Sequence, residues 1–273
     1  MTRVAVISDV HANTHALRAV LAALEEFGVS RFLCAGDLVG YGPHPNECVE
    51  MLRELPVVAV AGNHDLVALR RADISRCDPL ARQTLEWTIG QLTEASREYL
   101  GALPVVLSDS EIAMTHGSLA DRFEYINSAD LAAGQLADLS SQHPQARLLL
   151  LGHTHVPMAY GSRSGMLDAR QSRIRLDPAQ RYVLNPGSVG QSRDQSPDAS
   201  FLVLDTQTDE AFFRRVAYDI ESCREDLRRV GLPTKSCHRE PTRSSLTRRV
   251  ARRVKRLALR RGGGAESAAD ERK

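Results

Sequence analysis

Five of the nine histidines in the sequence come just after short apolar runs, and acidic or amide side chains accompany them. The set comprises Asp9, His11, Asp37, Asn63, His64, His116, His153 and His155. Asp9 and His11 are two residues apart, as are His153 and His155, so in an extended chain both members of a pair point to the same side. Mixed oxygen and nitrogen ligation suits zinc, manganese, iron or nickel, so the pattern predicts a metal site.

The apolar runs before these residues predict the strands that would position them. Residues 3–7, 31–35 and 56–61 each end in polar side chains, and residues 14–27 carry Leu and Val at helical spacing. A strand–helix–strand order indicates parallel pairing, and functional residues of parallel sheets gather at the carboxyl ends of the strands. We therefore expect Asp37 and Asn63 to lie beside Asp9 and His11.

The remaining chain predicts further strands and a helical excursion. Residues 66–103 and 129–139 have helical patterns, whereas 104–107, 111–115 and 146–151 read as strands. Short alternating runs at 172–176, 181–184, 201–204 and 211–218 predict antiparallel strands that form a second sheet. The expected fold class is therefore α/β (α+β).

Composition indicates a soluble globular protein with a separate basic end. The chain has 273 residues, of which 42% are hydrophobic and 25% charged. Its five cysteines lack C-x-x-C spacing, which favours reduced thiols. With neither a signal peptide pattern nor an apolar run of about 18 residues, the expected location is cytoplasmic. From Pro233 onward thirteen Lys or Arg face four Asp or Glu, a net charge of +9, whereas the rest carries −8.

Five ordered motifs resemble those of the calcineurin-like metallophosphoesterase superfamily. They are D-V-H at 9–11, G-D at 36–37, G-N-H-D at 62–65, T-H-G at 115–117 and G-H-T-H at 152–155. The loop at 36–43 and the segment N-P-G-S-V-G-Q at 185–191 look like the small bacterial and archaeal phosphodiesterase branch. The resemblance covers residues 1 to about 218.

The resemblance implies two facing mixed β-sheets flanked by helices, with two divalent metal ions at one edge. Asp9, His11 and His155 would hold the first ion, Asp37 would bridge, and Asn63, His116 and His153 would hold the second. Manganese, iron, zinc, cobalt or nickel would fit, with manganese favoured in vitro. The ions would share an attacking hydroxide, and His64 would donate a proton to the leaving oxygen. Asp65 could orient His64.

One departure from the family pattern narrows the substrate. Phosphoprotein phosphatases of the superfamily carry G-D-x-x-D-R-G, but Gly40 and Tyr41 stand here in place of the second Asp and the Arg. Arg193 is a candidate phosphate contact, with a surface salt bridge to Asp194 as its alternative. His44 and Tyr41 either touch substrate or serve only the structure of their loop.

The expected activity is hydrolysis of phosphodiesters of nucleotides or small molecules. A phosphomonoesterase, including a protein phosphatase, is one alternative, which the altered loop disfavours. A non-catalytic protein-binding scaffold is another, and it predicts eroded ligand positions, whereas all seven are intact.

The basic end divides into three expected segments beyond a catalytic domain at residues 1–221. They are a closing helix and linker at 222–242, a basic amphipathic helix at 243–261 and a disordered tail at 262–273. Arg248 to Arg261 could contact anionic membrane or nucleic acid, or could be a solubilising tail that docks on the acidic body.

Overall fold

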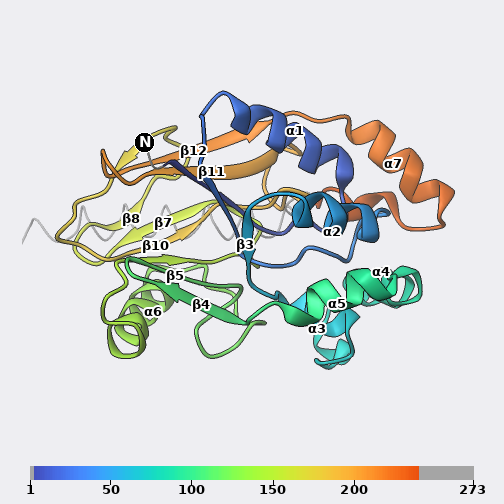
Figure 1. Ribbon diagram of the computed structural model, residues 1–273, viewed down its shortest axis with the longest axis horizontal. Helices are drawn as coiled ribbons and strands as arrows, with labels where there is room; N and C mark the ends of the chain where they lie inside the picture. The colour runs from blue at the N-terminus through green and yellow to red at the C-terminus, as the bar shows by residue number, and fades with distance from the viewer. Residues whose placement is uncertain (1–2, 240–273) are drawn as a thin grey trace, which may run out of the picture. The chain divides into compact units, whose positions relative to one another are not determined.

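The computed structural model describes residues 3–239 as two six-stranded mixed sheets with helices on their outer sides (Figure 1). The predicted basic helix at 243–261, with Arg248 to Arg261, and the tail at 262–273 lie outside the described residues. The expectation of two facing mixed sheets is confirmed.

The first sheet has the strand order β3-β2-β1-β11-β12-β9. Its strands are β1 (Arg3–Ile7), β2 (Arg31–Cys34), β3 (Val57–Ala59), β9 (Ile174–Arg175), β11 (Ala199–Asp205) and β12 (Glu210–Val216). β1 pairs in parallel with β2, and β2 with β3, as the strand–helix–strand pattern predicts. The carboxyl ends of these three strands therefore share one edge of the sheet.

The second sheet has the strand order β4-β5-β6-β10-β7-β8. Its strands are β4 (Val106–Asp109), β5 (Ile112–Thr115), β6 (Leu148–Leu150), β7 (Met158–Gly161), β8 (Gly165–Leu167) and β10 (Tyr182–Asn185). β5 and β6 are parallel, so the residues that follow them also meet at one edge.

Some helices pack on the outer faces of the two sheets, and others pack on those helices (Figure 1). The helices are α1 (Thr14–Glu25), α2 (Pro45–Arg53), α3 (Asn63–Ala68), α4 (Pro79–Gln91), α5 (Glu94–Ala102), α6 (Ala129–Gln142) and α7 (Ile220–Arg229), with short 3₁₀ turns at Ile74–Arg76 and Thr234–Ser236. Side-chain caps start several of them: Asn13 accepts from the Ala16 N–H before α1, and Asp78 accepts from Leu80 and Ala81 before α4.

Three apolar layers hold the sheets and helices together. Val6, Leu150 and Leu202 belong to the layer shared by the two sheets. Leu17 of α1 and Val203 of β11 belong to the layer beneath the helices of the first sheet. A third layer packs α6 on the second sheet. Because both faces of the central strands are covered, they read as continuous apolar runs in the sequence.

The strands after residue 157 do not form a sheet of their own, which corrects the sequence-based expectation. β11, β12 and β9 extend the first sheet, because β11 pairs antiparallel with β1 from Arg3↔Asp205 to Val6↔Leu202. β10 pairs in parallel with β6 instead. β1 has β2 on only one side, so its other edge needs a partner, and the almost wholly buried β11 supplies it.

Residues 230–239, which we expected to belong to a linker, pack on the body. Leu232 and Cys237 are buried with Cys223 and Leu227 of α7. Gln191 donates to the Ser236 carbonyl at 3.0 Å. All five cysteines are unbonded and buried, in line with the reduced thiols expected.

Candidate metal centre and its pocket

The carboxyl ends of five strands bring all the predicted metal-ligating residues together. Asp9 and His11 follow β1, Asp37 follows β2, and Asn63 opens α3 after β3. From the second sheet, His116 follows β5, and His153 and His155 follow β6. All seven side chains are buried. Neither sheet alone holds the complete set.

Asp9, His11, Asp37 and His155 form one group whose ligand atoms lie within 4.8 Å of one another. The Nε2 atoms of His11 and His155 are 3.1 Å apart, and Asp9 Oδ1 is 3.1 Å from His155 Nε2. Asp37 Oδ2 is 3.7 Å from His11 Nε2. Two carboxylates and two imidazoles thus face one point.

Asp37 also belongs to a second group, with His116 and His153. Its Oδ2 is 3.1 Å from His116 Nε2. The Asn63 side chain is buried, and its Oδ1 has no hydrogen-bond partner. One carboxylate therefore stands between two clusters of nitrogen and oxygen ligands.

Backbone carbonyls fix the orientation of the four imidazoles. The Nδ1 atoms of His11, His116 and His155 lie 3.1, 2.7 and 2.6 Å from the carbonyl oxygens of Val39, Ala35 and Gln191, respectively. His153 instead places Nε2 3.0 Å from the Phe123 carbonyl. Such contacts set the ring tautomer and leave the opposite nitrogen free to ligate a metal.

Each carboxylate has one oxygen held by the backbone and one without a partner. Asp9 Oδ2 accepts from the His153 N–H at 3.1 Å, and Asp37 Oδ1 accepts from the His64 N–H at 2.8 Å. Asp9 Oδ1 and Asp37 Oδ2 are buried without a hydrogen bond, as is His116 Nε2. Buried polar atoms are rarely left unpaired, so these atoms fit the ligands of metal ions.

The ligand-bearing turns adopt backbone conformations that are unusual outside glycine. Asp9, His11, Asp37, His153 and His155 all have φ between 49° and 66°. Left-handed conformations cost free energy for L-residues and cluster at functional sites. Adjacent glycines permit the close packing: a Cβ at Gly62 would lie 2.0 Å from Asp37 Oδ1.

Burial and neighbouring charges set the protonation of the imidazoles. Burial lowers the pKa of His153 to about 3 and that of His155 to about 4, with Arg193 adding to the effect at His155. Burial also opposes a charge on His116, but the Asp37 carboxylate outweighs it and raises its pKa to about 9. His153 and His155 are therefore neutral, which is the metal-binding form of histidine.

His64 lies beside the ligand cluster, and Gly40 packs against its ring. A Cβ at Gly40 would lie 2.2 Å from His64 Nδ1, which has no hydrogen-bond partner. Burial lowers the pKa of His64 well below its usual range. Because Nδ1 faces Gly40, Nε2 is the nitrogen that can reach the pocket.

Asp65 does not orient His64 through a hydrogen bond, contrary to the sequence-based expectation. Its Oδ2 accepts from the N–H groups of Asp37 and Gly62, both at 2.9 Å. Its Oδ1 accepts from those of Leu38 and Val39, at 2.9 and 3.2 Å. The carboxylate is occupied in bracing the turn that carries Asp37.

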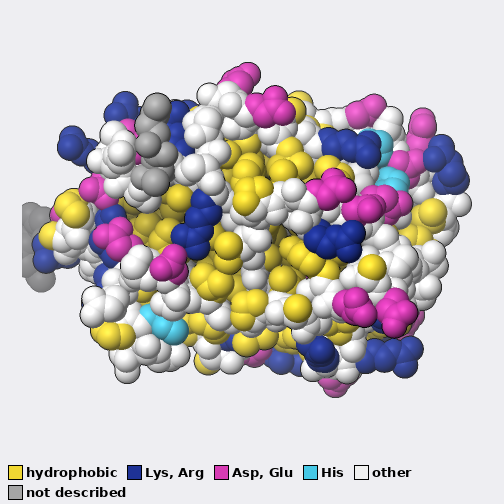
Figure 2. All heavy atoms as spheres, in the orientation of Figure 1, with side chains coloured by type: hydrophobic (Ala, Val, Ile, Leu, Met, Phe, Trp, Pro, Cys, Tyr) yellow, Lys and Arg dark blue, Asp and Glu magenta, His cyan; other side chains and the backbone are white. Residues whose placement is uncertain are grey.

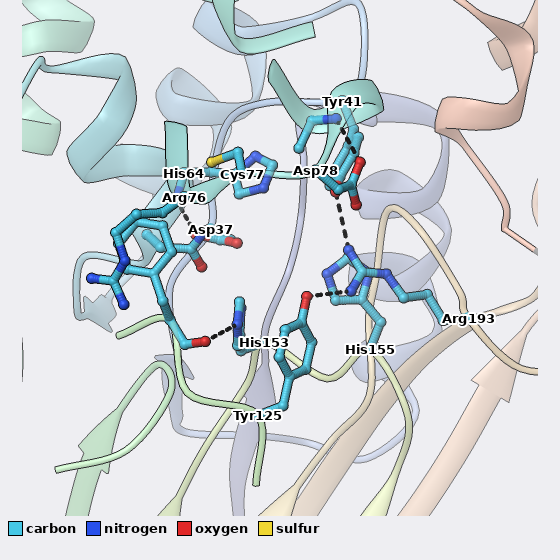
Figure 3. Close-up of a pocket in the computed structure, with 13 residues that line it drawn as sticks. Asp37, Tyr41, His64, Arg76, Cys77, Asp78, Tyr125, His153, His155 and Arg193 are labelled. Carbon is cyan, nitrogen blue, oxygen red and sulfur yellow. Dashed lines mark hydrogen bonds between the residues drawn. The ribbon is translucent and has the colours of Figure 1, made fainter. Parts of the chain in front are cut away.

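A pocket of about 280 Å³ opens beside the ligand cluster (Figure 3). Its lining residues are Asp37, Tyr41, Asn63, His64, Arg76, Cys77, Asp78, Ala81, Phe123, Tyr125, His153, His155 and Arg193. The Arg193 guanidinium lies between two phenols, 3.1 Å from Tyr41 Oη and 3.0 Å from Tyr125 Oη. No described carboxylate lies within ion-pair distance of Arg193, and Asp194 pairs with Arg215 instead. This corrects the alternative of a salt bridge between Arg193 and Asp194.

The family of the chain follows from comparison with known proteins. The model of the calcineurin-like phosphoesterase superfamily domain matches residues 2–209. The chain belongs to this superfamily. It is a metallophosphoesterase, a metal-dependent hydrolase of phosphoesters, and its buried His and Asp cluster is typical of a dinuclear centre in this superfamily.

Relatives of this phosphoesterase match nearly their whole length. An uncharacterized protein of Methanocaldococcus jannaschii is 32% identical over 236 residues, which are 84% of this chain and 93% of the relative. The crystal structure of a metallophosphoesterase from Sphaerobacter thermophilus has a TM-score of 0.75 and 36% identity, covering 86% of this chain and 96% of that one. A hypothetical protein of Pyrococcus horikoshii shares the fold, with a TM-score of 0.71, 23% identity and coverage of 87% and 96%.

Two further findings concern the substrate side of this phosphoesterase. His44, a candidate substrate contact, does not line the pocket: its Nδ1 lies 3.0 Å from Thr14 Oγ1 and its Nε2 3.3 Å from Asp226. Conversely, Tyr125 and Phe123 line the pocket but could not be predicted from the sequence, because neither lies in a motif. No helix among residues 3–239 is long and apolar enough to cross a membrane.

Proposed function

We propose that the protein is a dinuclear metal-dependent phosphodiesterase acting on small diesters such as those of nucleotides, with residues 1–221 as its catalytic domain. The observation that carries the proposal is the set of unpaired ligand atoms of Asp9, Asp37, Asn63 and His116, gathered at one buried point beside an open pocket.

In this proposal the ligands divide between two ions. Asp9, His11 and His155 would hold the first, and His116, His153 and Asn63 would hold the second. Asp37 would serve both ions, which is supported by its membership of both ligand groups. Two divalent ions in such a site supply an activated water nucleophile and stabilise negative charge on the phosphoryl oxygens.

His64 and Arg193 act on the substrate. His64 Nε2 delivers a proton to the leaving oxygen, a role that its place in the pocket lining supports. The Arg193 guanidinium binds a non-bridging phosphoryl oxygen, and the hydroxyl groups of Tyr41 and Tyr125 hold it in place. Arg193 thereby takes the part of the arginine that Tyr41 replaces in the family motif.

Apart from the metal ions, the arginines that line the pocket suit a diester better than a monoester. A phosphodiester carries one negative charge, whereas a monoester carries about −1.5 to −2 at pH 7. Of the two arginines in the described lining, Arg76 is paired with Asp121 at 2.6 Å, which leaves Arg193 as the cation without a carboxylate partner. The rings of Phe123 and Tyr125 offer apolar surface for a second ester group.

A substrate panel tests the proposal. After loading with Mn²⁺, we expect turnover of bis(p-nitrophenyl) phosphate and nucleoside cyclic phosphates to exceed that of p-nitrophenyl phosphate at least about tenfold in kcat/KM. An Asp37→Asn variant should lose turnover and bound metal together. A preference for the monoester would contradict the diester assignment. A purified protein that shows neither bound metal nor turnover after loading would contradict the proposal that it is a metal-dependent enzyme.

The role of Arg193 can be tested separately through kcat/KM for the diester. Losing a hydrogen bond from a charged group costs about 1.5–3 kcal/mol, so Arg193→Met should lower kcat/KM for the diester roughly 10- to 100-fold. Arg193→Lys keeps the positive charge but lacks the planar guanidinium. Its kcat/KM should lie between that of the unchanged protein and that of Arg193→Met. Arg170→Met removes an exposed arginine paired with Asp168 and serves as the control. Unchanged kinetics in Arg193→Met would exclude the phosphate contact.

A further inference from the structure

A second cluster of potential metal ligands lies outside the pocket, on three helices distant in sequence. It consists of His15 in the first turn of α1, His44 at the N-cap of α2 and Asp226 on α7. These side chains are 18–23% exposed, so an ion from solution can reach them. Figure 2 shows histidine side chains at the surface among charged ones where Figure 1 places α7.

The ligand atoms already stand close to the spacing that a metal ion requires. His15 Nε2 and His44 Nε2 lie 2.8 and 3.3 Å from the same oxygen, Asp226 Oδ2. One ligand atom from each of the three residues lies within 4.8 Å of the other two. Ligands at about 2.0–2.2 Å from a tetrahedral zinc ion are about 3.4 Å apart. Lengthening the His15 contact by about 0.6 Å and the His44 contact by about 0.1 Å would bring both to that spacing.

Neighbouring contacts direct the ligand atoms of His44 and Asp226 toward the cluster. His44 Nδ1 lies 3.0 Å from Thr14 Oγ1, so donation to that hydroxyl presents the lone pair of Nε2 to the cluster. Asp226 Oδ1 accepts from Arg229 at 2.5 Å, which leaves Oδ2 for the imidazoles. Supporting hydrogen bonds of this kind orient the ligands of protein metal sites.

We propose that His15, His44 and Asp226 form a third metal site, separate from the dinuclear centre, that takes Zn²⁺ or a similar first-row dication. Two imidazoles and one carboxylate are a common zinc ligand set, and water completes the tetrahedron. The ion fastens α7 to α1 and α2. Both of these helices follow directly on turns of the active site, since α1 begins three residues after His11 and His44 lies three residues after Tyr41.

Zinc stoichiometry tests this site in the full-length protein. After treatment with a chelator, the chain is dialysed against Zn²⁺ and the bound metal is measured per chain. We expect three ions for the unchanged protein and two for Asp226→Asn, which removes the negative charge of the carboxylate, and for His15→Gln, which removes the imidazole nitrogen. Both variants should retain phosphoesterase turnover. His143→Asn, a change of the half-buried histidine that caps α6, is the matched control and should keep three ions.

The outcomes separate this site from the proposed function. Two ions in the unchanged protein, with no loss in Asp226→Asn, would overturn the third site and leave the dinuclear centre intact. Three ions in the unchanged protein and also in Asp226→Asn would mean that the third ion binds elsewhere, which would also overturn the proposed third site. One ion that disappears in Asp226→Asn, with no turnover, would support the third site while contradicting the dinuclear centre. As a second readout, Zn²⁺ should raise the Tm of Asp37→Asn more than that of an Asp37→Asn, Asp226→Asn double variant.

Discussion

Among the single residues of the site, Asp9 and Asp37 each use one oxygen to accept a hydrogen bond from a backbone N–H. The other oxygen of each is buried without a hydrogen bond and lies 3.1 Å from the Nε2 atom of His155 or His116. Leaving a buried polar atom unpaired costs about 1–3 kcal/mol or more when it is charged. The folded chain therefore stores a free-energy cost that a bound cation relieves.

Gly40 leaves the space that the His64 ring occupies. Gly40→Ala would place a methyl group 2.2 Å from His64 Nδ1, so the ring must move. Misplacing a general acid should lower kcat by about 10²-fold while bound Mn²⁺ per chain stays unchanged. Steady-state assays measure kcat, and metal analysis of the purified variant measures bound Mn²⁺ per chain.

The control for this substitution is Gly165→Ala on β8. Gly165 has φ +70°, close to the +85° of Gly40, but no atom lies within 4 Å of its added Cβ. It bears the same backbone cost without the clash and should retain kcat. Full turnover in Gly40→Ala would exclude His64 as the proton donor.

At the scale of elements, Asp65 ties two strand ends together. Its four backbone hydrogen bonds join the turn after β2 to the start of α3. α3 is only six residues long and would be unstable alone, so this carboxylate and the packing of the helix hold it in place. Asp65 thereby positions both Asp37 and Asn63 without touching the pocket.

Asp65→Asn should act on stability. The amide keeps one acceptor oxygen, but its NH₂ group would face two backbone N–H donors and leave them unpaired. We expect a loss of roughly 3 kcal/mol in the free energy of unfolding, measured by urea denaturation of the metal-free protein. Asp73→Asn, in which the exposed Asp73 accepts from Ser75, should lose no more than about 1 kcal/mol. Equal losses in the two variants would contradict the bracing role.

Element types and the gathering of the candidate ligand residues at one edge were predictable from the sequence, because strand ends and helix faces leave local patterns. The parallel order of β1, β2 and β3 followed from the helices between them. The pairing of β1 with β11 could not be predicted in this way. It joins Arg3 to Asp205, far apart in the sequence, and the residues of β11 have the same local pattern as any buried strand. For the same reason Arg193 could be named as a candidate, but its contacts with Tyr41 and Tyr125 could not be foreseen.

At the scale of the whole molecule, the metal centre joins the two sheets. Asp9, Asp37 and Asn63 come from the first sheet, whereas His116, His153 and His155 come from the second. A ligand that binds only the folded state stabilises it in proportion to the logarithm of its concentration. Bound metal ions would therefore stabilise the packing of one sheet on the other.

Removing the metal should lower the melting temperature measurably. At a metal concentration of 100 times Kd the stabilisation is about 2.7 kcal/mol, or roughly 5–10 °C in Tm for a domain of this size. Differential scanning calorimetry, first with chelator and then with increasing concentrations of Mn²⁺, measures how Tm depends on the metal. A His116→Gln variant should lose most of the rise. A Tm independent of Mn²⁺ would contradict binding at the interface of the sheets.

The pairing of β1 with β11 also has a consequence for synthesis on the ribosome. β1 and β2 emerge first, but the second partner of β1 begins only at Ala199, about 160 residues after β2 ends. At about 5–20 residues per second, β1 waits roughly 10–30 s with one edge uncovered. Nascent chains released before residue 199 should thus be digested by protease far faster than chains ending after β12, and they should bind no metal tightly. β1 is thus synthesised long before the strand that completes its pairing.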